Sequence, residues 1–104
     1  MNIEQIKQVV QNEVVPHITG VYTINVFGSY ANGNYDNESD VDFRVELDNH
    51  FQGSIINVIG SIIIQFEKIF DRKYKLKSEV IFGDKNKRFV PLDIENEVQI
   101  YAKN

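Results

Sequence analysis

The sequence contains no cysteine and only two histidines among its 104 residues. Without cysteine, the chain forms neither a disulfide framework nor a thiolate zinc site. The two histidines, His17 and His50, are too few and too far apart to indicate a histidine-rich metal centre. Metal chemistry based on sulfur or on a histidine cluster is therefore excluded.

The chain also lacks a long hydrophobic segment. Its longest apolar run is far shorter than the roughly 20 residues that a membrane helix needs, and no cationic and apolar signal segment opens it. We therefore expect a cytoplasmic protein without membrane contact. With 104 residues, of which 42% are hydrophobic, residues 1–104 fit one domain with one modest core and leave nothing for a second substrate domain.

Positive charge is in the minority, and it is unevenly distributed. The net charge of −4 argues against unspecific nucleic-acid binding. Between Arg72 and Arg88, however, seven basic residues stand against two acidic ones. This basic segment is typical either of a solvated strand and loop or of a surface that meets a triphosphate or an acidic partner.

The most informative stretch runs from Val21 to Leu47. An apolar run, Val21–Phe27, predicts a strand that ends at Gly28-Ser29. A second run, from Asp40 to Leu47, alternates strictly between polar and apolar residues, which is the period of a half-buried strand. Two carboxylates, Asp40 and Asp42, therefore project from one face, where their oxygens suit divalent cations.

The Gly28-Ser29 turn predicts a second element of the same site. It leads into a brief helical stretch whose free backbone N–H groups attract phosphate oxygens. The loop Asn32–Ser39 is rich in turn formers, so we expect it to be exposed and mobile. Tyr35 in this loop is either a plain surface residue or a platform on which a base stacks. If the two strands pair, anion cradle and carboxylates are adjacent.

The remaining elements follow from periodicity. Apolar residues at helical spacing predict a first helix over residues 3–15, ended by Pro16, and a long helix over residues 55–70. The segment Tyr74–Phe82 predicts a third strand, and Pro91–Tyr101 predicts a final helix. The expected fold class is thus α+β, with a small mixed sheet of about three strands and the order helix–strand–strand–helix–strand–helix.

These motifs resemble those of a known family. Gly28-Ser29 after a hydrophobic strand, followed by Ser39-Asp40-Val41-Asp42 opening the next, is similar to the G-S…D-x-D signature of the DNA polymerase β-like nucleotidyltransferases. The form GSYANG…SDVDF is most similar to the minimal nucleotidyltransferases (MNT), which are often encoded beside HEPN-domain toxins. The similarity covers nearly the whole chain.

The resemblance implies a nucleotidyltransferase-like fold and transfer of a nucleoside monophosphate. Asp40 and Asp42 would bind two Mg²⁺ ions, while Gly28, Ser29 and Ser39 would hold the nucleotide. The family adds a third acid on the next strand, and Glu79 is the best-aligned candidate because Asp84 lies beyond that strand, in a turn. The chain departs from the pattern here, where the family usually has aspartate. Asn32 also stands where the MNT motif commonly has arginine.

The resulting functional hypothesis is transfer of AMP from ATP to a hydroxyl of an all-helical HEPN-type partner, which makes the chain an antitoxin. One alternative is a catalytically degenerate antitoxin or regulatory module that acts by contact. A second is a small-molecule nucleotidyltransferase of the aminoglycoside-modifying type. Direct nucleic-acid binding is not expected, and oligomer formation is left open.

Overall fold

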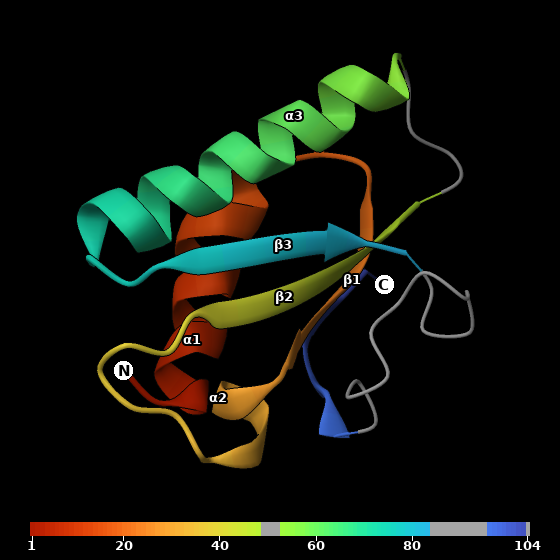
Figure 1. Ribbon diagram of the computed structural model, residues 1–104. Coiled ribbons are helices and arrows are strands. Elements are labelled where there is room, and N and C mark those ends of the chain that lie inside the picture. The colour runs from red at the N-terminus through yellow and green to blue at the C-terminus, as the bar shows by residue number, and fades with distance from the viewer. Residues whose placement is uncertain (49–52, 84–95, 104) are drawn as a thin grey trace.

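A computed structural model describes residues 1–48, 53–83 and 96–103. The first helix, α1 (Ile3–Val9), continues as a π-helical turn, Val10–Val14, and a 3₁₀ turn, Val15–His17. Strand β1 (Val21–Phe27), the short helix α2 (Ser29–Asn32) and strand β2 (Val41–Leu47) follow. Helix α3 (Ile55–Phe66) continues as a π-helical segment, Glu67–Lys73, and is followed by the strands β3 (Ser78–Phe82) and β4 (Val98–Ala102). Figure 1 shows α1 and α3 beside a small sheet.

The four described strands form one mixed sheet in the order β3-β2-β1-β4. The two neighbours of β1 run antiparallel to it, whereas β3 runs parallel to β2. The long connection through α3 makes this parallel pair possible, because parallel strands need a crossover. The α+β class and the mixed sheet are confirmed, with four strands rather than about three.

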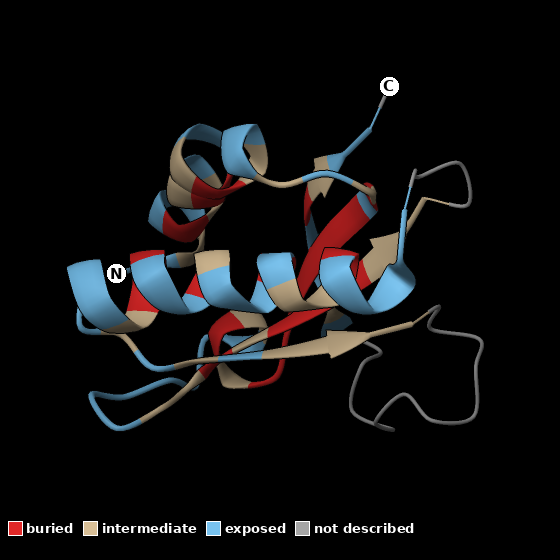
Figure 2. Cartoon of the chain, turned by 90° about the horizontal axis from the view of Figure 1, so that it is seen from above, coloured by how far each residue is buried: buried red, intermediate tan, exposed pale blue. Residues whose placement is uncertain are grey.

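One core holds the helices to a single face of the sheet. Phe43 of β2 lies between two phenylalanines of the α3 region, with ring centroids 4.7 Å from Phe66 and 5.1 Å from Phe70. Ile6 of α1 and Ile24 of β1 are fully buried in the same cluster. The predicted first helix and the predicted helix over residues 55–70 are both confirmed, since their apolar stripes are the buried faces (Figure 2).

The predicted final helix is wrong over its described part. Residues Val98–Ala102 form β4, while residues 91–95 lie outside the described range. In this short segment Ile100 is buried and its neighbours are not, so an alternating pattern and a helical one fit almost equally well. The free edge of β1 favours the strand over the helix, because it offers this segment a ladder of backbone hydrogen bonds.

The third strand is shorter at its start than the predicted Tyr74–Phe82. Residues before Ser78 close the preceding helical segment instead: the Tyr74 N–H donates to the Ile69 carbonyl, and the Leu76 N–H to the Phe70 carbonyl. Lys75 between them has a φ of 57°, which is incompatible with an extended strand. No helix in the described ranges is long and apolar enough to cross a membrane.

Glu13 connects the first helical segment, residues 3–17, to the α3 region. Its carboxylate accepts hydrogen bonds from the Lys73 ammonium and the Tyr74 hydroxyl, and its backbone carbonyl accepts one from the Gln65 amide at 3.0 Å. The Lys73 hydrogen bond, followed by the Tyr74 hydrogen bond, lowers the pKa of Glu13 below its ordinary value. The charged carboxylate is therefore the form that the fold favours.

We predict an acid-dependent loss of stability that runs through Glu13. Because the folded-state pKa is lowered, the stabilisation is present above the ordinary carboxyl pKa and is lost as the pH falls through the folded-state pKa. Urea unfolding between pH 6 and pH 3 should show a steeper loss of the free energy of unfolding in the wild type than in Glu13→Gln. Equal slopes would contradict this role, and Glu4→Gln, an exposed acid on the same helix, is the control.

Candidate active site

The end of β1 and the start of β2 meet at Gly28. In the antiparallel register Phe27 lies opposite Asp42, so the next residue, Gly28, lies against the Asp42 side chain. Its φ of 73° and ψ of −149° belong to a region that favours glycine. A Cβ atom on Gly28 would approach Asp42 Oδ2 to 2.5 Å. The glycine therefore provides the space that the carboxylate occupies.

Glu79 lies directly beside Asp42 on the other side. The parallel register of β2 and β3 pairs these two residues, and paired residues on neighbouring strands share a face of the sheet and lie about 4.8 Å apart at Cα. The sheet thus brings Gly28, Asp42 and Glu79 together across three strands. Sequence reasoning placed the three residues on separate elements, and only the register makes them neighbours.

Asp40 lies just before β2, next to a lysine. Its Oδ2 is 3.8 Å from the Lys77 ammonium, and the N–H of the following residue, Val41, donates to the Lys77 carbonyl at 2.9 Å. The Asp40 side chain is 27% exposed and that of Lys77 is 71% exposed. An exposed ammonium group from the basic segment therefore stands beside the Asp40 carboxylate.

Other basic residues of that segment contact acids of the same chain. Lys73 pairs with Glu13, and Arg72 lies 3.6 Å from Glu67. The described part of the basic segment is thus partly neutralised within the fold. Residues 84–95, which include the alternative acid Asp84, lie outside the described range.

Ser29 and Ser39 lie in different local structures. Ser29 is the first residue of the short helix α2, in which the Asn32 N–H donates to the Gly28 carbonyl at 3.1 Å. Ser39 belongs to a turn with Asp36: its hydroxyl donates to Asp36 Oδ1 at 3.1 Å and accepts from the Asp36 N–H at 2.9 Å. Ser29 therefore lies at the turn after β1, beside Gly28, whereas the Ser39 hydroxyl is engaged within the loop.

The predicted loop Asn32–Ser39 is exposed over residues 32–38, and Tyr35 in it stacks on a ring outside it. The Tyr35 ring lies 4.2 Å from the Tyr30 ring at an interplanar angle of 5°. Tyr30 itself is buried, and this burial, followed by the nearby Tyr35 and Asp36, raises the pKa of its hydroxyl. One face of Tyr35 is therefore already covered by the protein.

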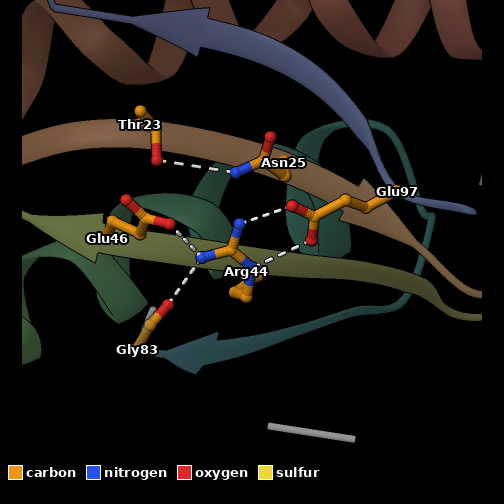
Figure 3. Close-up of polar contacts among 6 residues, drawn as sticks. All are labelled: Thr23, Asn25, Arg44, Glu46, Gly83 and Glu97. Atoms are coloured by element: carbon orange, nitrogen blue, oxygen red, sulfur yellow. Dashed lines mark hydrogen bonds and ion pairs between the residues drawn. The ribbon is translucent and has the colours of Figure 1, made fainter. Parts of the chain in front are cut away.

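Arg44 is a buried neighbour of Asp42 to which the sequence assigned no role. The alternation of β2 placed it on the same face as Asp42, and there it is 2% exposed. Figure 3 shows its guanidinium among Glu46, Glu97 and Gly83. Its guanidinium donates to both carboxylate oxygens of Glu97, at 2.9 and 2.5 Å, to Glu46 at 2.5 Å and to the Gly83 carbonyl at 2.7 Å. These hydrogen bonds, with Glu97 first, raise the pKa of Arg44 and keep it charged despite burial.

Asp40, Asp42 and Glu79 have the ligand chemistry of a divalent-cation site, but the structure does not bring the three carboxylates together as a metal site. Asp42 and Glu79 supply paired carboxylates on one face, and Asp40 stands two residues before Asp42, which is the hard oxygen chemistry that Mg²⁺ prefers. Among residues 1–48, 53–83 and 96–103, no group of three or more acids or histidines is close enough to hold a metal ion.

Comparison with known proteins adds to this geometry. The model of the nucleotidyltransferase domain family matches residues 3–101, almost the whole chain. The chain belongs to the nucleotidyltransferase domain family. No curated protein matches it significantly.

Two solved structures share the nucleotidyltransferase-like fold. A candidate nucleotidyltransferase from Sulfolobus solfataricus, solved at 1.40 Å resolution, superimposes with a TM-score of 0.59 at 16% identity, covering 96% of this chain and 79% of that chain. A toxin–antitoxin crystal structure with AMP-PNP gives a TM-score of 0.65 at 15% identity, covering 99% of this chain and 75% of that chain. At such low identity the likeness extends to the fold alone.

We predict that Gly28→Ala destabilises the fold by about 1–3 kcal/mol, because alanine is strained at this backbone conformation and its Cβ displaces the Asp42 carboxylate. Urea unfolding measures the loss. Gly33→Ala is the control for a positive φ alone, since a Cβ there meets no atom within 4 Å. In an Asp42→Ala background Gly28→Ala should cost less, and an unchanged cost would show that the contact with Asp42 is unimportant.

We further predict that Arg44→Met lowers the free energy of unfolding by about 3 kcal/mol, because it leaves the Glu97 and Glu46 carboxylates without their buried cation. Chemical denaturation measures the effect. If the ion pairs are responsible, the triple variant with Glu97→Gln and Glu46→Gln recovers most of the loss. Equal destabilisation of the single and triple variants would attribute the cost to lost packing instead.

Proposed function

We propose that this nucleotidyltransferase domain transfers AMP from ATP to a hydroxyl group of a protein partner, as the antitoxin of a toxin–antitoxin pair. The observation that carries the proposal is the convergence of Gly28, Asp42 and Glu79 at adjacent strand ends. A phosphate cradle next to paired carboxylates suits a metal-bound nucleoside triphosphate. The toxin–antitoxin neighbour, which was solved with AMP-PNP, supports both the nucleotide and the protein partner.

The chemistry is an in-line displacement at the α-phosphate. The acceptor oxygen forms a bond to the α-phosphorus, the bond from that phosphorus to the bridging oxygen breaks, and pyrophosphate leaves while the acceptor loses its proton. Mg²⁺ ions, when bound, would stabilise the attacking and leaving oxygens. Asp40, Asp42 and Glu79 would hold them, and the backbone N–H groups that follow Gly28, together with the Ser29 hydroxyl, would orient the phosphates.

Lys77 adds a positive charge at the edge of this site. It lies 3.8 Å from Asp40 and is mostly exposed, so its flexible side chain is available to an incoming polyphosphate. The chain has Asn32 where the related motif commonly carries arginine, and Lys77 supplies a cation from another element. A HEPN-type helical protein is the partner that we propose, and the acceptor hydroxyl belongs to it.

We predict that ATP binds to the wild-type chain in the presence of Mg²⁺ and not in EDTA, as measured by titration calorimetry. Asp42→Asn and Glu79→Gln should each weaken this binding at least about tenfold, because each removes one anionic ligand. Glu67→Gln, an exposed acid on the helix, is the matched control and should bind like the wild type.

Transfer is tested by incubating the chain with α-labelled ATP, Mg²⁺ and a co-expressed helical partner. Label that appears on the partner and is lost in Asp42→Asn supports the proposal. Partner binding that persists in Asp42→Asn without any transfer would instead indicate an antitoxin that acts by contact. A parallel incubation replaces the partner with an aminoglycoside. Label that appears on the aminoglycoside and not on the partner would favour the small-molecule enzyme.

A further inference from the structure

The outer face of α3 carries large exposed isoleucines and no charge, and nothing in the described chain covers it. No charged residue occurs from Ile55 to Phe66, whereas 25% of the whole chain is charged. The inner face of this helix packs into the core through Val58, Ile62 and Phe66. Three outward isoleucines of α3, Ile56, Ile63 and Ile64, are exposed by 77%, 43% and 66%. The exposed residues beside them, Asn57 and Ser61, are polar but uncharged. In Figure 2 this helix crosses the front of the molecule, with exposed segments along it.

Gly60 lies in the middle of this apolar face. Glycine weakens the interior of a helix relative to alanine, and Gly60 is not among the glycines with a positive φ. A Cβ atom placed on Gly60 would meet no atom within 4 Å. Neither backbone conformation nor crowding among the described residues therefore requires glycine here. A glycine between exposed isoleucines suits the close approach of a second helix.

We propose that the outer face of α3 binds the same face of a second copy of this chain, with the two helices antiparallel around a twofold axis near Gly60. A twofold interface must be self-complementary, and the sequence of α3 has this property. Ile56 and Ile64 lie four residues before and four residues after Gly60, on one stripe of the helix. Antiparallel pairing centred on Gly60 therefore places Ile56 of one copy against Ile64 of the other.

Area and charge are both consistent with a second copy as the occupant. The exposed parts of Ile56, Ile63 and Ile64 amount to on the order of 300 Å² of uncovered surface, about two thirds of the apolar share of the ~800 Å² that each partner contributes to a standard interface. Two copies with a net charge of −4 each repel one another through most of their surfaces. Contact through the uncharged face of α3 avoids this repulsion, because it does not bring like charges together.

The first test is the mass of the purified chain in solution by sedimentation equilibrium. The wild type should change from a monomer of 12.1 kDa to a dimer as its concentration rises. Ile56→Lys should raise the dissociation constant at least about tenfold, because a charge then enters an apolar contact. Tyr22→Lys is the control, since Tyr22 is also a large exposed apolar residue, at 51%, but lies on β1, and it should leave the dimer intact.

Gly60 gives a second variant whose two effects differ in direction. Gly60→Leu improves helix propensity, so the isolated chain should keep or raise its melting temperature. The same side chain obstructs the close approach, so the dimer should dissociate. A loss of dimer together with an intact circular dichroism spectrum excludes simple misfolding as the cause.

The absence of cysteine makes the orientation testable. In an antiparallel pair centred on Gly60, mild oxidation should link two copies of Gly60→Cys. It should not link two copies of Ile56→Cys, because those positions lie about 12 Å apart along the helix at 1.5 Å per residue. Mixing Ile56→Cys with Ile64→Cys should restore the link.

Three results would overturn the proposal. They are a wild type that stays monomeric up to millimolar concentration, a dimer that Ile56→Lys and Gly60→Leu leave intact, and a cross-link between two copies of Ile56→Cys as strong as that of Gly60→Cys. The first would assign the apolar face to a different occupant. The second would place the dimer contact elsewhere, and the third would show a parallel arrangement.

Discussion

The hydrogen-bond register of β2 with its two neighbours determines where the candidate site residues lie. Antiparallel pairing with β1 sets Phe27 opposite Asp42, so that Gly28 faces the carboxylate, and parallel pairing with β3 sets Glu79 on its other side. A shift of one residue would turn Asp42 into the core and Phe43 out of it. The buried contacts of Phe43 with Phe66 and Phe70 oppose such a shift. The aromatic core thus fixes the position of the carboxylates without touching them.

The two faces of the sheet are stabilised in different ways. The helical face is held by apolar packing and by Glu13, which receives hydrogen bonds from Lys73 and Tyr74. The opposite face buries a charged side chain, Arg44, whose N–H groups donate to Glu97, Glu46 and the Gly83 carbonyl. Buried ion pairs contribute little net stability, but removal of one partner is costly. Arg44, which lies two residues from Asp42, therefore holds β2 to the end of β3 and the start of β4.

The chain belongs to the nucleotidyltransferase domain family and shares its fold with a toxin–antitoxin structure. The site that we propose lies at the strand ends of this fold. Glu79, where the resemblance leads one to expect aspartate, has a side chain longer by one methylene, and its register places it beside Asp42. The proposal that a partner supplies the acceptor rests on the fold shared with the toxin–antitoxin structure.

Sequence alone determined the elements whose periodicity is long or strict: the first helix, the long helix, the strands at Val21–Phe27 and Val41–Leu47, and the motif residues Gly28, Asp40 and Asp42. Tertiary structure decided the rest. Val98–Ala102 became a strand because the edge of β1 was available to it, a choice that five residues cannot encode locally. Arg44 became a buried centre only because Glu97, 53 positions away in sequence, reaches it. Local patterns reveal which face a residue lies on, whereas the partner on that face depends on strand order and register, which involve distant parts of the chain.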